Sequence, residues 1–378
     1  MFKKIIYLIF IIAISGFSAI FADRYLFPRI ANTSFFSRSK LLRSFTADVT
    51  VINKTEQVYV KEDSTVAKLA SNINSSVVNI ISFSEPDLKS KNQENATKNL
   101  TGVVVTSDGL IMTYFSSIPQ ENLKYKVILA DQSTYDADFL SVDSYSNLGF
   151  LKINASNLPT LSFANSDDFQ AGEKIIAIGN DLGNYQNRFA QGLLNDFNSG
   201  FNISSSAISS SEKMEGVFET DKKLEDGFVG GPVIDYSGQA IAITGSVIKN
   251  NEAQYFLIPS SKVQAVIQKT IKQETRNNAQ LGIYYIPVTK TLALTQSLPV
   301  EKGAQIFSPS GQQGLAMIAN SAASKAGLQI YDIITAVNAQ EINSQNTLPD
   351  LLYKYKKGDT IELTVLRAGK EIKLSVQL

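Results

Sequence analysis

The stretch Asp226-Gly-Phe-Val-Gly-Gly-Pro-Val-Ile-Asp235 constrains the fold more than any other part of the sequence. Its glycines at positions 227, 230 and 231 permit positive φ angles and a close approach of the backbone. Such a loop can direct consecutive backbone N–H groups toward one point, where they would bind an oxyanion. The apolar residues that follow Pro232 predict a β-strand. Taken alone, the stretch fits a β-turn in any antiparallel protein equally well, so the rest of the chain has to decide.

The composition excludes several kinds of chemistry. The 378 residues suggest two or three domains, and 35 basic residues balance 35 acidic ones, so nucleic acid is not an expected partner. The absence of cysteine excludes disulfides and thiolate metal sites. The absence of histidine excludes every Ser-His-Asp and Cys-His mechanism and removes the commonest ligand of catalytic zinc. We therefore expect no metal and no cofactor.

The N-terminus carries an uncharged apolar run, residues 5–22, directly after Lys3 and Lys4. As a helix it would be about 27 Å long, close to the span of a bilayer. Two interpretations remain: a cleaved signal peptide, or a retained single-pass anchor with its N-terminus inside the cell. We favour the anchor, because residues 19–22 make a poor cleavage site. Residues 1–22 would then be the anchor segment and residues 23–63 a juxtamembrane spacer, which places the globular domains outside the cytoplasm.

Short β-strands dominate the sequence that follows a predicted short helix at residues 65–74. The expected strands are residues 76–82, 102–106, 110–113, 126–129, 134–139, 148–153, 174–179, 189–194, 217–220 and 239–247. Many short strands separated by turns are typical of β-barrels or sandwiches. A helix over residues 260–272, with its apolar side chains on one face, would close this domain.

Six motifs within this region occur in a recognisable order. They are Ser76-Val-Val-Asn-Ile80, Gly102-Val-Val-Val-Thr-Ser-Asp-Gly-Leu-Ile-Met-Thr113, Leu161-Ser-Phe-Ala-Asn-Ser-Asp167, Ala177-Ile-Gly-Asn180, Gly230-Gly-Pro-Val233 and Phe256-Leu-Ile-Pro-Ser260. In their order and spacing the chain resembles the HtrA/Deg family of membrane-associated, trypsin-like serine proteases. The resemblance implies a mostly β fold, with a chymotrypsin-like double β-barrel over residues 64–272 and an α+β PDZ domain behind it.

The resemblance also locates the catalytic triad, and all three positions are substituted. Ser116 stands where the family has histidine, Asn147 where it has aspartate, and Val229 where it has the nucleophilic serine. A serine hydroxyl is too weak a base at neutral pH, and valine has no nucleophilic atom. The loop Gly227, Phe228 and Val229 would retain at most an oxyanion-type pocket of backbone donors. We therefore expect a pseudoprotease with no catalytic residues.

Other catalytic arrangements find little support in the sequence. Lys222 and Lys223 lie in a charged run, which is typical of a solvated loop rather than of a desolvated Ser-Lys pair. The serine-rich residues 204–211 indicate a flexible surface loop. Asp167 and Asp168 indicate the start of a helix or turn, not a metal site.

The last hundred residues, 279–378, resemble a bacterial PDZ domain. The motifs that carry the resemblance are Ser321-Ala-Ala-Ser-Lys-Ala-Gly327 and Asp332-Ile-Ile-Thr-Ala-Val-Asn338. We expect further strands at residues 280–286 and 314–318, a helix at 348–355 and a C-terminal hairpin from 359. The resemblance implies that Leu281, Gly282 and Ile283 bind a peptide carboxylate, with an apolar pocket formed by Ile283 and by Leu348, Leu351 and Leu352. The alternative is that this loop is only a strand entry and the domain a spacer.

These observations predict a membrane-anchored, HtrA-like pseudoprotease that binds exposed C-termini or unfolded segments in extracytoplasmic protein quality control. Two alternatives stay open. One is a serine-type endopeptidase with a non-standard catalytic arrangement. The other is a non-catalytic regulatory subunit of an active relative. The expected assembly is a homotrimer or a mixed trimer, since the family that the chain resembles trimerises through its protease domain.

Overall fold

The computed structural model of the chain divides into two units, residues 1–60 and 61–378. It describes Tyr7, Ile14, Ser15, Ser18, Phe21, Ala22 and Leu69 individually, and residues 73–84, 98–115, 123–181, 184–204, 206 and 208–378. Most of the predicted anchor at residues 5–22 and all of the spacer up to residue 63 lie outside these residues. Among the described residues, no helix is both long and apolar enough to cross a membrane.

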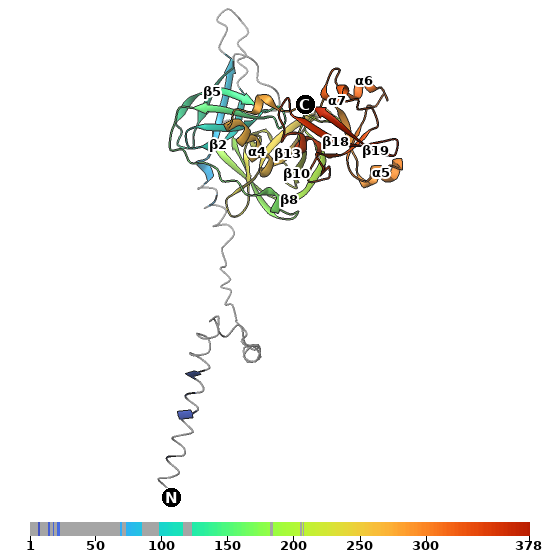
Figure 1. Ribbon diagram of the computed structural model, residues 1–378. Coiled ribbons are helices and arrows are strands. Elements are labelled where there is room, and N and C mark those ends of the chain that lie inside the picture. Colours follow the sequence, from blue (N-terminus) through green and yellow to red (C-terminus); the bar gives the residue numbers. More distant parts are fainter. Residues whose placement is uncertain are drawn as a thin grey trace, which may run out of the picture. The chain divides into compact units, whose positions relative to one another are not determined.

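Two closed six-stranded antiparallel barrels make up the first part of the second unit (Figure 1). The first barrel has the strand order β1-β2-β3-β6-β5-β4. Its strands are β1 Val77–Ser84, β2 Lys98–Thr106, β3 Leu110–Tyr114, β4 Leu123–Ile128, β5 Thr134–Val142 and β6 Leu148–Ile153. The hairpins expected around residues 107–109 and 130–133 are confirmed by the pairing of β2 with β3 and of β4 with β5.

The second barrel has the strand order β10-β13-β12-β11-β7-β8 and carries the glycine-rich loop. Its strands are β7 Lys174–Asp181, β8 Gln186–Asn202, β10 Glu215–Thr220, β11 Pro232–Ile234, β12 Ala240–Lys249 and β13 Glu252–Pro259. The 3-10 helix η3 Ser166–Asp168 precedes it, as the Asp167-Asp168 pair predicts, and helix α4 Ser260–Ile271 follows it. The prediction of a mostly β, chymotrypsin-like double barrel is confirmed.

The PDZ domain is built on a sheet with the order β19-β18-β16-β15-β14-β9, with β17 paired to β16. Its own elements are η5 Thr275–Asn277, β14 Tyr284–Pro287, α5 Lys290–Gln296, β15 Ala304–Ile306, α6 Gln313–Ala316, α7 Ala322–Lys325, β16 Ile333–Val337, β17 Gln340–Glu341, α8 Leu348–Leu352, β18 Thr360–Arg367 and β19 Lys370–Gln377. The sixth strand on the path, β9 Ser209–Ser210, comes from the hairpin between β8 and β10 of the second barrel.

Two predictions about local structure are wrong. Residues 314–318 were expected to form a strand, but those up to 316 form the one-turn helix α6, where the side chain of Gln313 bonds to Leu328 and Ile330. Of the expected strand, Met317 alone pairs, in an isolated antiparallel bridge to Ile283. Residues 204–211 were expected to be a flexible surface loop, but Ser209 and Ser211 are buried and β9 pairs with β14. Backbone pairing to a distant strand is invisible in a serine-rich sequence.

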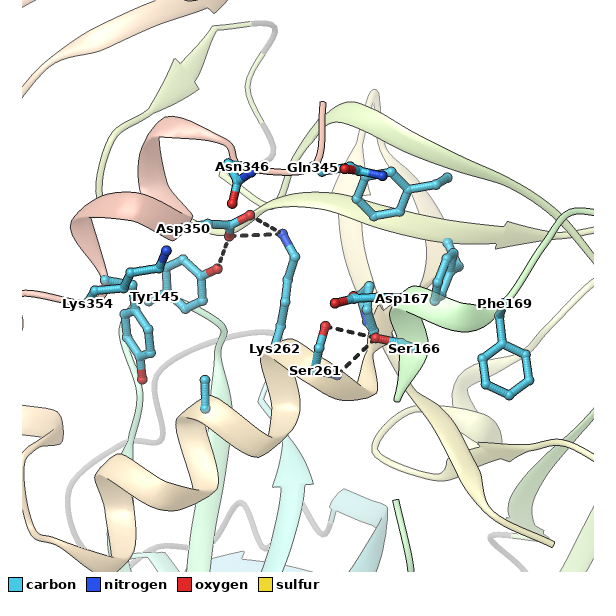
Figure 2. Close-up of a pocket in the computed structure, with 15 residues that line it drawn as sticks. Tyr145, Ser166, Asp167, Phe169, Ser261, Lys262, Gln345, Asn346, Asp350 and Lys354 are labelled. Carbon is cyan, nitrogen blue, oxygen red and sulfur yellow. Dashed lines mark hydrogen bonds and ion pairs between the residues drawn. The ribbon is translucent and has the colours of Figure 1, made fainter. Parts of the chain in front are cut away.

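The junction between the second barrel and the PDZ domain is polar and hydrogen-bonded (Figure 2). Lys262, on α4, forms an ion pair with Asp350 of α8 at 2.7 Å, and both side chains are largely buried. Asp350 also accepts a hydrogen bond from Tyr145, whose ring stacks on Tyr353 with 4.1 Å between centroids. A buried pair of this kind adds little net stability, but removing one partner would leave an uncompensated charge.

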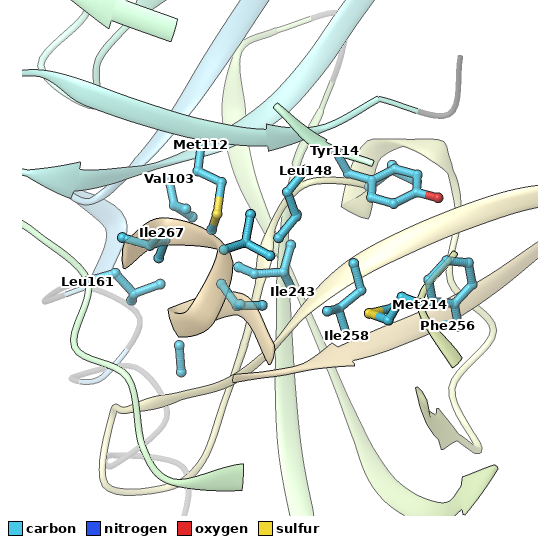
Figure 3. Close-up of a cluster of buried hydrophobic side chains, with 14 of the residues drawn as sticks. Val103, Met112, Tyr114, Leu148, Leu161, Met214, Ile243, Phe256, Ile258 and Ile267 are labelled. Carbon is cyan, nitrogen blue, oxygen red and sulfur yellow. The ribbon is translucent and has the colours of Figure 1, made fainter. Parts of the chain in front are cut away.

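The largest hydrophobic core joins both barrels to helix α4 (Figure 3). Met112 and Leu148 come from the first barrel, Ile243 and Phe256 from the second, and Ile267 from α4; all are buried. Because side chains from both barrels interdigitate, the loop that they carry between them is held in one place. A separate cluster fills the PDZ domain.

Candidate functional site

The glycine-rich loop begins with a 3-10 turn, η4 Asp226–Phe228, that uses its own N–H groups. The N–H of Phe228 donates to the carbonyl of Glu225 at 2.9 Å, and the N–H of Val229 donates to the carbonyl of Asp226 at 3.1 Å. We expected Gly227 and Val229 to present N–H groups to a common point. In this conformation the N–H of Val229 is already satisfied within the turn and does not face an oxyanion.

The first barrel fixes the position of this loop. Thr101 donates its hydroxyl to the carbonyl of Gly227 at 2.8 Å, and Thr113 donates to the carbonyl of Thr101 at 2.6 Å. Gly230 has φ +84°, and a Cβ atom there would lie 2.2 Å from the carbonyl oxygen of Thr101. The loop therefore requires glycine at 230. Val229, at the position matched to the nucleophile, is only 7% exposed and belongs to the core that joins the barrels.

Asn147, at the position matched to the triad aspartate, contacts two residues that its sequence context does not predict. Its amide nitrogen donates to the hydroxyl of Tyr114 at 3.3 Å, and its amide oxygen accepts from Lys213 Nζ at 2.8 Å. Burial lowers the pKa of Lys213, while the nearby Asp143 opposes that shift. Lys213 is thus a candidate base at this position, but the amide oxygen that it contacts gives it no proton to abstract. Ser116 lies outside the described residues.

Asp143 starts the segment that resembles the family's aspartate motif, and it ties the barrel to the PDZ domain. Its carboxylate is fully buried and accepts hydrogen bonds from the N–H and hydroxyl of Ser146, from Asn278 of the linker at 2.9 Å and from Tyr353 at 3.2 Å. Burial raises the pKa of Asp143, and these hydrogen bonds oppose the rise. Its contacts support domain docking and reach no nucleophile.

The Leu281–Ile283 loop of the PDZ domain, predicted to bind a carboxylate, has its glycine in the left-handed region. Gly282 has φ +79°, and a Cβ atom there would lie 2.4 Å from the side chain of Ser321. The carbonyls of Leu281 and Gly282 accept from the N–H groups of Ala323 and Ile318, both at 2.9 Å. These bonds hold the loop from behind, so the N–H groups of Gly282 and Ile283 point the other way.

Those two N–H groups are occupied by residues of the second barrel. The N–H of Gly282 donates to the carboxylate of Glu212 at 2.7 Å, and the N–H of Ile283 donates to the hydroxyl of Ser211 at 3.1 Å. The N–H of Ser211 in turn donates to the carbonyl of Ile283 at 3.1 Å. Carboxylate binding by this loop stays a prediction, and the sequence did not indicate that Ser211 and Glu212 occupy its donors.

The predicted apolar pocket is filled in this structure. Ile283, Leu348, Leu351 and Leu352 are each at most 2% exposed and belong to one buried cluster. The structure therefore brings the predicted residues together, as core rather than as an open pocket.

Glu215 lies beneath the segment that fills the loop. Its carboxylate is buried and accepts hydrogen bonds from Tyr285 at 2.6 Å and from Ser209 at 3.0 Å, so it joins strands β14 and β9 from below. Burial, the largest cause, raises the pKa of Glu215 to about 7, against the lowering effect of these two hydrogen bonds.

Comparison with known proteins agrees with this architecture. Residues 100–243 match the family described as a trypsin-like peptidase domain, and residues 293–378 match the PDZ domain family. The probable periplasmic serine endoprotease DegP-like of Chlamydia muridarum is 30% identical over 283 residues, which cover 73% of this chain and 53% of that protein. The serine protease Do-like HtrA of Lactobacillus helveticus is 28% identical over 265 residues, which cover 67% of this chain and 61% of that protein.

Solved structures show the same fold. The HtrA-type protease AlgW with a tripeptide superposes with a TM-score of 0.63 at 21% identity, over 82% of this chain and 95% of that one. AlgW with a decapeptide gives a TM-score of 0.61. The fold and the two family matches define a trypsin-like peptidase domain joined to a PDZ domain. The chain is a homologue of the HtrA and DegP-like serine proteases, and it spans about half the length of the DegP-like curated relatives that it matches.

The buried Glu215 carboxyl makes the stability of the protein depend on pH. Its pKa is near 4.5 when unfolded and about 7 when folded, so the folded state holds the extra proton between these values. Stability from this group is therefore full below pH 4.5 and is lost as pH rises to about 7, by about 3 kcal/mol. Replacing Glu215 by Gln should remove this loss, so that the melting temperature of the variant gains on the wild type as pH rises from 4.5 to 7.5.

The matched control is Glu219→Gln, an exposed position on the same strand, which should follow the wild-type curve. Parallel curves for Glu215→Gln and the wild type would show that Glu215 titrates normally in the folded protein.

Proposed function

We propose that the chain is an HtrA-like pseudoprotease whose PDZ domain binds the free C-termini of exposed or unfolded protein segments without cleaving them. The absence of cleavage is inferred from the buried Val229 at the position matched to the nucleophile, in a chain with no histidine. The binding of free C-termini is inferred from the arrangement of Gly282 and Ile283, two adjacent backbone donors that face acceptor oxygens.

Loss of proteolysis follows from chemistry rather than from fold. Acyl transfer needs a nucleophile, a base and donors for the oxyanion, and loss of the triad costs about six powers of ten in turnover. Val229 supplies no nucleophile, and its N–H is used inside the turn. The endopeptidase alternative would have to rely on Lys213, whose observed partner is the amide oxygen of Asn147.

We expect the purified chain to cleave neither casein nor another unfolded substrate at any pH. The Val229→Ser variant should also be inactive, because the chain has no histidine to act as its base. Both can be checked by release of labelled peptide and by labelling with a fluorophosphonate. Substantial turnover by Val229→Ser would show that another side chain, with Lys213 first in line, serves as the base.

Peptide binding is supported by the carboxylate and the strand that already contact this loop and the adjoining sheet edge. A C-terminal carboxylate captured by a PDZ domain accepts backbone N–H bonds while its chain adds a strand to the sheet edge. Here Gly282 donates to a carboxylate, and a strand lies on the edge of β14. The AlgW structures with a tripeptide and a decapeptide make peptide binding a reasonable expectation for this chain as well.

A peptide with a free, apolar C-terminus should bind the full chain at least ~10-fold more tightly than its amidated form, because charge-assisted hydrogen bonds are worth about 1.5–3 kcal/mol each. Fluorescence anisotropy on the two peptides measures the ratio. Gly282→Val should abolish binding of the acid, since its φ of +79° and the approach of Ser321 leave no room for a side chain. Equal affinity for acid and amide would remove carboxylate capture and leave the domain as a spacer.

We further propose that residues 5–22 anchor the protein in a membrane, with the globular domains outside the cytoplasm. The support is the uncharged run after Lys3 and Lys4, together with the description of the DegP-like relatives as probable periplasmic proteins. An inserted segment is not released by salt, unlike peripheral charge contacts. The full-length chain should therefore stay in the membrane pellet after high-salt washing. Recovery of a soluble protein that starts near Asp23 would establish cleavage instead.

A regulatory role beside an active relative, as a homotrimer or in mixed trimers, would use the same groove. It is distinguished from independent binding by the subunit composition of complexes isolated from native membranes.

A further inference from the structure

Residues 209–212 of the second barrel, here called the internal segment, lie along the edge of the PDZ sheet. Ser210 stands opposite Tyr284 and Ser209 opposite Tyr285, in antiparallel register with β14. The chain therefore runs toward the Leu281–Ile283 loop and reaches it at Glu212. This is the direction in which a peptide would approach if its C-terminus ended at that loop.

The internal segment ends in a carboxylate at the position where a ligand would end. Glu212 Oε1 accepts from the N–H of Gly282 at 2.7 Å, a short distance typical of a charge-assisted bond. The hydroxyl of Ser211 donates to the same oxygen at 2.8 Å and accepts from the N–H of Ile283 at 3.1 Å. Both donors of the loop are thus engaged, one directly by the carboxylate and the other through Ser211.

A PDZ ligand is recognised by two features, strand addition at the sheet edge and capture of its terminal carboxylate. The internal segment has both, although it is neither a terminus nor part of the PDZ domain. We propose that it is a built-in competitive ligand, with the Glu212 side chain in place of a C-terminal carboxylate, and that a partner C-terminus binds only by displacing it. This inference rests on the proposed function, because it concerns the same groove.

The segment is anchored by hydrogen bonds on both sides of Glu212. At the base, Glu215 accepts from Ser209, and Asn202 donates to the carbonyl of Ser210 at 3.2 Å. On the other side of Glu212, Lys213 donates to Asn147 at 2.8 Å and its carbonyl accepts from Asn202 at 3.0 Å. Between these anchors the strand is only two residues long and Glu212 is half-buried. A cavity of about 890 Å³, also lined by Ile318 and Gly282, borders Glu212. An incoming carboxylate can therefore reach Gly282 from this side while the base stays attached.

The first test compares peptide affinity in the full chain and in Glu212→Ala. Removing the competing carboxylate should tighten the binding of a labelled peptide with a free, apolar C-terminus by ~10-fold or more, the change expected for the loss of one charge-assisted hydrogen bond. The matched control is Glu219→Ala, an exposed glutamate seven residues further along the hairpin, which should bind as the wild type does. Unchanged affinity in Glu212→Ala would overturn the internal ligand.

Comparison with the amidated peptide distinguishes carboxylate capture by the loop from the internal-ligand proposal. If the acid is preferred in every variant but Glu212→Ala gains nothing, carboxylate capture stands and the internal ligand fails. If acid and amide bind alike in every variant, carboxylate capture itself fails, and the internal ligand with it.

The second test locks the segment in place with an engineered disulfide. No other thiol can interfere, because the chain has no cysteine of its own. Ser210→Cys combined with Tyr284→Cys places two thiols on directly opposed residues, close enough for a disulfide to form. Oxidation should abolish peptide binding, and a reducing agent should restore it. Failure of the bond to form, or equal peptide affinity in the oxidised and reduced protein, would contradict the proposal.

Discussion

The pairing of β9 with β14 is the interaction on which the arrangement of the molecule depends. It extends the PDZ sheet with a strand from the second barrel, so the sheet edge that would otherwise be open is covered. Around it lie the other contacts between the domains: Asp143 with Asn278 and Tyr353, and Lys262 with Asp350. Each of these buried carboxylates has partners on the opposite domain, so separating the domains would leave charges without partners. The pairing therefore contributes to the docking of the domains and places Ser211 and Glu212 against the Leu281–Ile283 loop.

Much of the fold could be predicted from the sequence because local patterns carried it. The alternating apolar residues of β2 and β3 around the Ser107–Gly109 turn, and the motifs before β16, predict their elements without reference to distant residues. β8 was predicted only at residues 189–194 but extends to Asn202, because its polar second half is held by pairing with β10. Propensity could not show that, since the pairing and not the residue type keeps this part of the strand.

The sequence shows which catalytic residue types the site lacks, but it does not show which residues contact one another there. The lack of histidine and the identity of Val229 can be read directly from the sequence. That Lys213 meets Asn147 and that Glu212 meets Gly282 cannot, because these pairs are separated by 66 and 70 positions and no local pattern links them. The serine-rich composition of residues 209–211 predicted a flexible loop. In the structure, their hydroxyls and backbone groups form hydrogen bonds that extend a sheet. The residues that contact the Leu281–Ile283 loop thus lie where the sequence is least informative.

An internal ligand changes what the groove can select. The apparent dissociation constant of a competing peptide equals its intrinsic value divided by the fraction of molecules with a free groove. If the internal segment occupies the groove ~99% of the time, every peptide loses about 100-fold in apparent affinity, and a weak carboxylate contact alone no longer suffices. Tethering gives the segment an effective concentration in the millimolar range for a short linker, so a ligand must bring added strand pairing or high local concentration to compete. Exposed termini of unfolded chains held near the domain meet that condition better than dilute free peptides do. Under the proposed function, an internal ligand would in this way let the PDZ domain discriminate among C-termini without cleavage.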